Sequence, residues 1–230
     1  MIKGIVNSYF VSDQNLKLLQ PLLTDQSIYS VWDFGEGVDG VAAMRMALYS
    51  HILSDMRAIM FDPGNKVTSM KNIIAALEDN GASKLIRESF CTPTGVDVCG
   101  DYSPEDEQSL IETIQREDVE QKMSLFDETK KTVLQQYLEL ENSELGQRID
   151  AARSRMISHK QVTTIEGQRK LFDASDFGLK FSDAKDIIEE SKSIIFGANL
   201  LLLNGSYDLK SFLGHHDLVA TKFWSKCQNA

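Results

Sequence analysis

The chain has 230 residues, of which 42% are hydrophobic and 25% charged, a composition that supports a buried core and excludes wholesale disorder. It carries 34 Asp and Glu against 24 Lys and Arg, and the resulting net charge of −10 argues against a broad DNA-binding surface. No uninterrupted apolar run reaches the ~18 residues that a membrane-spanning helix needs. The first residues lack the apolar core of a signal peptide. We therefore expect a cytoplasmic protein with no membrane contact.

The cysteines and glycines do not form the common metal or cofactor motifs. The cysteines are odd in number, contain no Cys-x-x-Cys pair and do not form a disulfide framework; they are Cys91, Cys99 and Cys227. A cluster of glycines at positions 35, 37 and 40 is not followed by Gly-Lys-Ser/Thr, so it is not a phosphate loop. The sequence predicts no bound metal and no cofactor.

Residues 1–25 look separate from the rest of the chain. Apolar residues between Ile2 and Val11 predict a short strand or a docking arm. The leucines between Leu16 and Leu23 predict a short helix or turn. We therefore expect an N-terminal arm, or a set of short elements, over residues 1–25.

The next part of the chain has a helical pattern. From about residue 30 to Phe61, apolar residues recur in steps of three and four, which predicts a helix. Asp62-Pro63-Gly64-Asn65 ends it. Thr68 or Ser69 then caps a helix that ends at Asp79-Asn80-Gly81, and a short helix is expected near Ser83–Phe90.

No proline occurs after Pro104, and a long stretch without the strongest helix breaker indicates further helices. Ser103 caps the first of them, with Pro104 at its first position and acids in its first turn. The apolar spacing predicts one segment to about Val119 and a second through Leu140. A cap at Asn142 or Ser143 then begins a helix over residues 144–158.

The end of the chain completes an all-α pattern. Residues 160–181 lack a long period and predict an irregular connection. A helix is expected from Ser182 to Asn204-Gly205, and another near residues 208–225. The sequence thus predicts a helical bundle with one long loop, formed as a single domain over residues 26–230.

Of the four histidines, His159 has the surroundings best suited to chemistry. His51 lies in an apolar helix, where a structural histidine is the simpler interpretation. His215 and His216 are adjacent and point in different directions, so one ion does not bind both. His159 ends the run Arg153-Ser154-Arg155-Met156-Ile157-Ser158-His159, in which arginines precede it on the same predicted helix.

Histidine and arginine together suffice for metal-independent cleavage of RNA. Histidine titrates near neutral pH and can exchange a proton with a reacting hydroxyl or leaving group. Arginine stays charged and binds phosphate with two parallel hydrogen bonds. The simpler alternative is that Arg and His near a helix C-terminus only interact favourably with the helix dipole.

The run from Arg153 to His159 resembles the signature of HEPN domains (higher eukaryotes and prokaryotes nucleotide-binding). That signature is an arginine, a polar residue and then a histidine after four to six intervening residues; here five intervene, and the polar residue is Ser154. The resemblance is closest to bacterial abortive-infection proteins of the AbiU type. Features around residues 58–73 and 179–183 are also similar, so the resemblance spans roughly residues 30–205.

This resemblance implies a HEPN-like bundle of four or five helices that forms a homodimer. In HEPN ribonucleases the arginine and histidine of two copies meet in one cleft. Carried over, Arg153 binds or polarises the phosphate and His159 transfers the proton, with Ser154 as the motif's polar support. Arg155 is an added basic contact that helix geometry, not the motif, suggests.

Two functions follow from these observations. The first is a HEPN ribonuclease, a hydrolase of RNA in antiviral defence or toxin–antitoxin biology, with an antitoxin or another defence protein as a possible partner. The second is a non-catalytic HEPN-like module that binds a nucleotide or a partner protein. The serine in place of the more usual Asn, Asp or His keeps the second hypothesis open.

Overall fold

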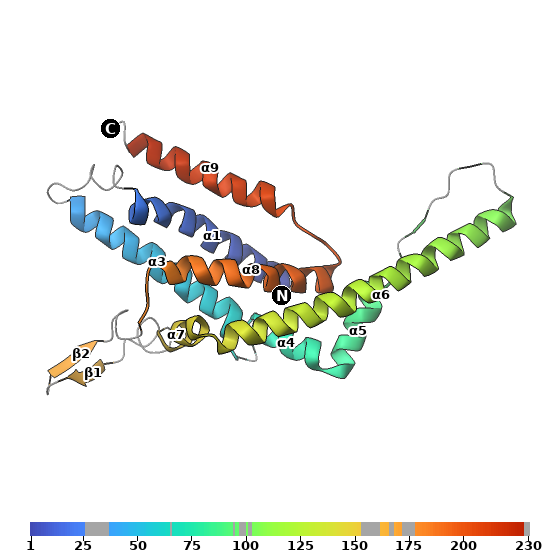
Figure 1. The fold of residues 1–230 in the computed structure, drawn as a ribbon, viewed down its shortest axis with the longest axis horizontal. Coiled ribbons are helices and arrows are strands. Elements are labelled where there is room, and N and C mark those ends of the chain that lie inside the picture. The colour runs from blue at the N-terminus through green and yellow to red at the C-terminus, as the bar shows by residue number, and fades with distance from the viewer. Residues whose placement is uncertain are drawn as a thin grey trace.

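The structure is a computed structural model that describes residues 1–25, 37–64, 66–93, 95–96, 100, 103–152, 162–165, 168–171 and 178–227. In these ranges the chain forms eight helices and one antiparallel hairpin (Figure 1). The helices are α1 (Ile2–Thr24), α3 (Gly37–Phe61), α4 (Met70–Glu78), α5 (Asn80–Phe90), α6 (Pro104–Asn142), α7 (Glu144–Ala152), α8 (Ser182–Leu203) and α9 (Leu209–Cys227). The predicted all-α fold is therefore confirmed.

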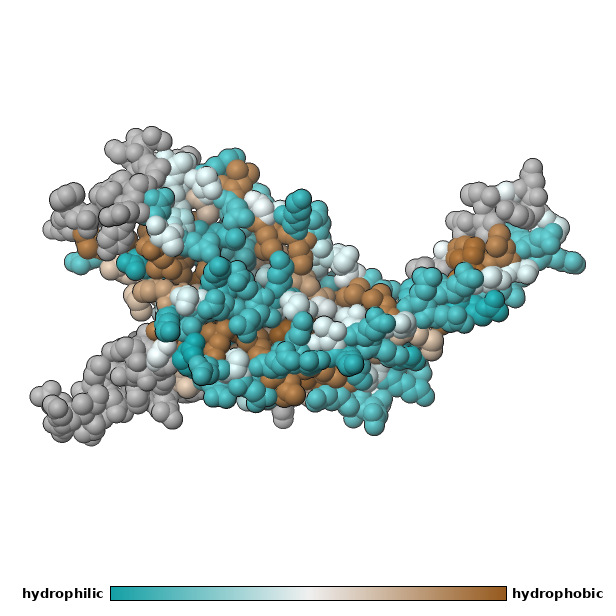
Figure 2. Space-filling model, in the orientation of Figure 1, coloured by the Kyte–Doolittle hydropathy of each residue, from teal (hydrophilic) through white to brown (hydrophobic). Residues whose placement is uncertain are grey.

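The core lies where α1, α3, α6 and α8 meet. α1 packs against α3, α8 and α9, and α6 packs against α8, as the ribbon shows. Apolar side chains from these helices are buried in one cluster, and the surface facing the viewer in Figure 2 is largely hydrophilic between smaller apolar areas. Fully buried members of this cluster include Ile5, Tyr9, Leu53, Met56, Phe126, Ile187 and Ile194.

Residues 2–24 form one helix, so the short strand predicted near the start was wrong, and the leucines predicted as a short helix or turn belong to the same helix. The β-branched residues near the start favour a strand locally. However, the buried positions of α1 recur in steps of three and four along its whole length: Ile2, Ile5, Val6, Tyr9, Ser12, Asp13, Leu16, Leu19 and Leu22. Because this period matches a helix, the whole face packs on α3 and α8 instead of remaining a separate arm.

Residues 104–142 form a single 39-residue helix, α6, where the apolar spacing predicted two segments. The predicted start is confirmed: the Ser103 hydroxyl accepts a hydrogen bond from the Asp106 amide at 3.2 Å, and Pro104 occupies the first turn. The pattern changes near residue 120 because only the C-terminal half of α6 has core contacts; its buried residues are Phe126, Val133, Tyr137 and Leu140.

Other predicted helix ends are also confirmed. The Ser69 hydroxyl caps α4 by accepting from the Asn72 amide, and α8 ends at Asn204 in the left-handed conformation. Within the predicted irregular connection, the structure contains a hairpin of β1 (Val162–Ile165) and β2 (Gln168–Leu171), with Val162 opposite Leu171. Among the described residues, no helix combines the length and apolar character needed to cross a membrane.

The contact between α6 and α8 includes one point of very close approach. Gly197 lies on α8, and a Cβ atom at this position would be only 2.6 Å from Cγ2 of Val133 on α6. Val133 is 1% exposed and cannot move into solvent. The close packing of α6 on α8 therefore requires glycine at position 197.

We predict that residue 133 decides whether Gly197→Ala lowers or raises the free energy of unfolding. In the natural chain the added methyl group collides with Val133 and lowers the free energy of unfolding by about 1–2 kcal/mol. In a Val133→Ala background the collision is gone, and the better helix propensity of alanine makes the same change neutral or stabilising by up to ~1 kcal/mol. Urea unfolding of the four proteins measures both differences; equal losses in both backgrounds would refute the close approach.

Candidate functional site

The candidate residues directly follow α7 in the sequence. Arg153, Ser154, Arg155 and His159 lie outside the described residues, so the structure does not test their predicted roles. The structure does describe the chain on both sides: α7, which ends at Ala152, and residues 178–183, which lead into α8.

α7 begins in a tight junction with α6. The Ser143 hydroxyl donates to the Leu140 carbonyl at 2.8 Å and accepts from the Gly146 amide at 3.0 Å, so one side chain ends α6 and caps α7. A Cβ atom on Gly146 would collide with the Leu140 carbonyl oxygen, so this junction requires glycine. α7 then buries Leu145, Ile149 and Ala152.

Arg57 anchors one side of α7 to α3. Arg57 is 7% exposed, and its Nε and Nη2 atoms both lie 2.8 Å from Oδ1 of Asp150. Its Nη1 atom lies 3.4 Å from Oδ2 of Asp62, just after the end of α3. Because a buried guanidinium needs carboxylate partners, this pairing fixes the last turn of α7 against α3.

Arg148 anchors the other side of α7 to the start of α8. Its Nη2 atom donates to Oδ1 of Asp183 at 3.0 Å, and its Nη1 atom lies 3.6 Å from the exposed Glu144 carboxylate. The Asp183 side chain is 2% exposed, and its second oxygen accepts from the Lys180 amide at 2.9 Å. One buried carboxylate thus joins α7 to the turn that precedes α8.

The same turn is held from α3. The Tyr49 hydroxyl donates to the Lys180 carbonyl at 2.9 Å, and its ring packs on Phe181. Burial raises the pKa of Tyr49, the nearby Asp183 raises it further and Arg148 lowers it, so the hydroxyl remains a neutral donor. The Arg45 guanidinium lies over the same Phe181 ring, 5.1 Å from its centre.

These contacts place the two flanks of residues 153–177 on one framework of α3, α7 and α8. Arg57 and Arg148 are both paired with carboxylates, so their role in this arrangement is structural. A small polar cavity of about 170 Å³ lies beside α7, lined in part by Arg57, Lys71, Glu141 and Asp150. Its lysine and Glu141 are also paired, at 2.8 Å.

The other histidines are not part of this framework. His51 is half exposed, with its Nδ1 atom 3.8 Å from Asp55 one turn later. His216 is 8% exposed on α9, and its Nδ1 atom lies 2.7 Å from Oδ2 of Asp13 on α1. This pair joins the C-terminal helix to the core, which agrees with a structural role for His216. Within the described residues, no group of three His, Cys, Asp or Glu side chains could hold a metal.

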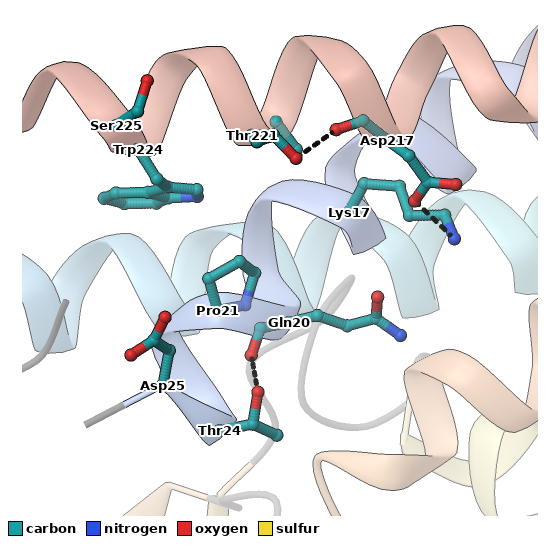
Figure 3. Close-up of a pocket in the computed structure, with 10 residues that line it drawn as sticks. Lys17, Gln20, Pro21, Thr24, Asp25, Asp217, Thr221, Trp224 and Ser225 are labelled. Atoms are coloured by element: carbon teal, nitrogen blue, oxygen red, sulfur yellow. Dashed lines mark hydrogen bonds and ion pairs between the residues drawn. The ribbon is translucent and has the colours of Figure 1, made fainter. Parts of the chain in front are cut away.

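A cavity of about 360 Å³ between α1 and α9 is a second place where a ligand could be sought (Figure 3). Its polar groups bond to one another or to the helices: Lys17 pairs with Asp217 at 3.0 Å, and the Trp224 indole donates to the Leu18 carbonyl. The cavity lies on elements that carry none of the predicted site residues. It therefore gives no support for a role in the same chemistry.

Comparison with protein families decides the relationship of the chain. The family model for AbiU2, a HEPN-superfamily domain, matches residues 6–223. The chain belongs to the AbiU2 family. No curated protein and no solved structure gives a match. The match includes α1 from Val6 onward and most of α9, so the family's domain extends beyond the residues 30–205 over which the motifs resemble it.

The anchoring residues of this AbiU2 domain were not predicted as functional. Arg57 offered a signal, because it interrupts the apolar run Met56-Arg57-Ala58-Ile59-Met60-Phe61 and a charge in such a run needs a buried partner. Arg148 lies five residues before the motif, on the same predicted helix, and nothing in its local sequence marks it as an anchor. The sequence does not show which carboxylates pair with them, because Asp150 is 93 residues from Arg57 and Asp183 is 35 residues from Arg148.

We predict that Arg148→Ala lowers the free energy of unfolding by about 2–3 kcal/mol, because it leaves the buried Asp183 carboxylate with only the Lys180 amide as a partner. The matched control is Lys185→Ala, which removes an exposed pair with Glu189 on α8 and changes stability by less than about 0.5 kcal/mol. Urea unfolding followed by circular dichroism measures both. Equal effects of the two substitutions would contradict the anchoring role of Arg148.

Proposed function

We propose that this AbiU2-family protein is a metal-independent endoribonuclease of phage defence. The observation that carries the proposal is the family match over residues 6–223, which includes the whole Arg153–His159 motif. The anchored flanks support it, because a catalytic segment must be held by rigid neighbours. Two ion pairs fix α7 immediately before the motif, and Asp183 fixes the chain after it.

The proposed reaction uses the RNA's own 2′-hydroxyl as the nucleophile. His159 accepts its proton as the oxygen attacks phosphorus, and the bond to the 5′-oxygen breaks as that oxygen takes up a proton from water. Arg153 binds the phosphate and stabilises the charge that develops on its oxygens. Ser154 supports the motif, and Arg155 adds a basic contact. The products are a 2′,3′-cyclic phosphate and a 5′-hydroxyl, with no metal or cofactor taking part.

We further propose that the active form is a homodimer with a composite cleft. Two copies of the motif bring together two sets of Arg153, Arg155 and His159, which concentrates positive charge in a protein of net charge −10. The expected setting is the cytoplasm, where RNA is the substrate and an antitoxin or another defence protein is the partner that controls activity.

We predict that the purified protein cleaves single-stranded RNA in the presence of EDTA and that His159→Ala slows cleavage by at least ~100-fold, the usual contribution of general acid–base catalysis. Arg153→Ala is expected to act similarly through lost phosphate binding. The matched control is His51→Ala, which removes an exposed histidine outside the motif and leaves the rate unchanged. The measurement is the initial rate on a fluorescent oligonucleotide, with circular dichroism to confirm folding.

The alternative is a non-catalytic HEPN-like module that binds a nucleotide or a partner protein. It predicts no cleavage by the natural chain, and weaker ligand or partner binding on Arg153→Ala and His159→Ala. If a folded His159→Ala variant cleaves RNA as fast as the natural chain, the ribonuclease assignment to this motif is wrong. Cleavage that EDTA abolishes would also exclude the proposed chemistry.

A further inference from the structure

The N-terminal half of α6 extends beyond the helical bundle (Figure 1). We call Pro104–Gln121 the arm; its 18 residues span about 27 Å. Within the described part of the chain, every hydrogen bond and ion pair made by arm side chains joins them to α6 or to its cap. The first described hydrogen bond from α6 to another element or loop is that from the Lys122 ammonium to the Thr92 carbonyl, at 3.1 Å.

An apolar stripe lies on one side of the arm, is interrupted by Asp118 and Gln121, and resumes past the arm at Leu125. Its members lie within about one third of the helix circumference, at 100° per residue: Leu110, Ile111, Ile114 and Leu125. Ile114 is 36% exposed and Leu125 45% exposed. In Figure 2, apolar atoms are visible on the projecting part of α6, with hydrophilic atoms beside them.

Ile114 and Leu125 of the stripe lie outside the face that α6 turns to the core, whereas half-buried Ile111 points within about 20° of buried Leu140. Leu125 and Phe126 are consecutive, so their side chains point about 100° apart. Phe126 is 1% exposed and packs on Phe90, whereas Leu125 is 45% exposed. The exposed members of the stripe, Ile114 and Leu125, therefore form a surface beside the core face of α6.

The arm also concentrates the negative charge of the protein. Its 18 residues contain seven Asp and Glu and one Arg, for a net charge of −6, which leaves −4 for the other 212 residues. Two exposed acids border the stripe at three-residue spacing: Glu117 follows Ile114, and Glu128 follows Leu125. Both acids lie on the same edge of the stripe, and an apolar seam with one acidic margin is complementary to an apolar seam with one basic margin.

We propose that this surface binds a partner protein through a basic amphipathic helix, whose apolar residues lie on the stripe and whose Lys or Arg side chains pair with Glu117 and Glu128. The charge selects this occupant over a second copy of the chain, because two arms packed side by side would place −6 against −6. A lone helix of this length is marginal in water, so a bound helix would also stabilise the arm. The proposal does not depend on RNA cleavage.

The test uses a fluorescent designed peptide of about 21 residues with Leu at its heptad seam and Lys at the flanking positions. Fluorescence anisotropy with the full-length protein should show binding that weakens as salt rises from about 0.05 to 0.3 M. Two reference peptides define specificity: one has the same composition with the seam scrambled, and one has Glu in place of Lys. Both should bind at least tenfold more weakly.

Matched variants locate the binding surface. Ile114→Ser/Leu125→Ser should weaken binding at least tenfold, and Glu117→Gln/Glu128→Gln should weaken it several-fold and reduce its salt dependence. Glu105→Gln/Glu112→Gln removes the same charge from the opposite side of α6, and Leu85→Ser removes an apolar side chain that is 68% exposed on α5. Both controls should leave binding unchanged.

Three results would overturn the proposal. Equal binding of the scrambled peptide, or binding unaffected by the stripe variant, would show non-specific charge attraction. Self-association in sedimentation that the stripe variant abolishes would assign the surface to a second copy. A clear fall in the Tm of the free protein on Ile114→Ser/Leu125→Ser would show that the chain itself covers the stripe.

Discussion

The buried carboxylate of Asp183 is the constraint on which the arrangement around the candidate segment depends. It is 2% exposed, and a charge so buried is stable only if strong donors satisfy it. Here Arg148 supplies one donor from α7 and the Lys180 amide supplies the other from the turn before α8. Because the two donors come from opposite flanks of residues 153–177, satisfying one carboxylate also fixes α7 and the turn before α8 relative to each other. Arg57 and Asp150 complete the same framework from α3.

The features that the sequence predicted correctly are those that depend on a few neighbouring residues. Helix caps at Ser69 and Ser103, and the left-handed end at Asn204, need only a few neighbouring residues, and they occur where the sequence places them. α1 was predicted wrongly because β-branched residues near its start outweighed a period that only packing on α3 and α8 makes decisive. The apolar pattern of α6 changes along the helix because the arm lacks the core contacts that the second half of α6 makes.

The candidate site was predictable to a different extent. The motif from Arg153 to His159 was found through a family resemblance, and the match over residues 6–223 confirms the family. The anchors were not predictable, since the partners of Arg57 and Arg148 are far away in sequence and many acids compete for them. The requirement for glycine at position 146 was not predictable either, because it arises only from the close approach of α7 to the Leu140 carbonyl.

The distribution of charge along α6 would allow the proposed anionic substrate to approach an acidic protein. More than half of the net charge of −10 lies on the arm, at the N-terminal end of α6, whereas α7 and the candidate motif follow its C-terminal end. The last residue of the arm, Gln121, lies about 30 Å along α6 from Asn142. Charges in solution are screened over about 8–10 Å at physiological salt, so the acids of the arm have little effect on a phosphate near the end of α7. With the proposed function, the same long helix would allow its acidic end to attract a basic partner while RNA approached the other end, so the net charge of the whole chain describes neither end.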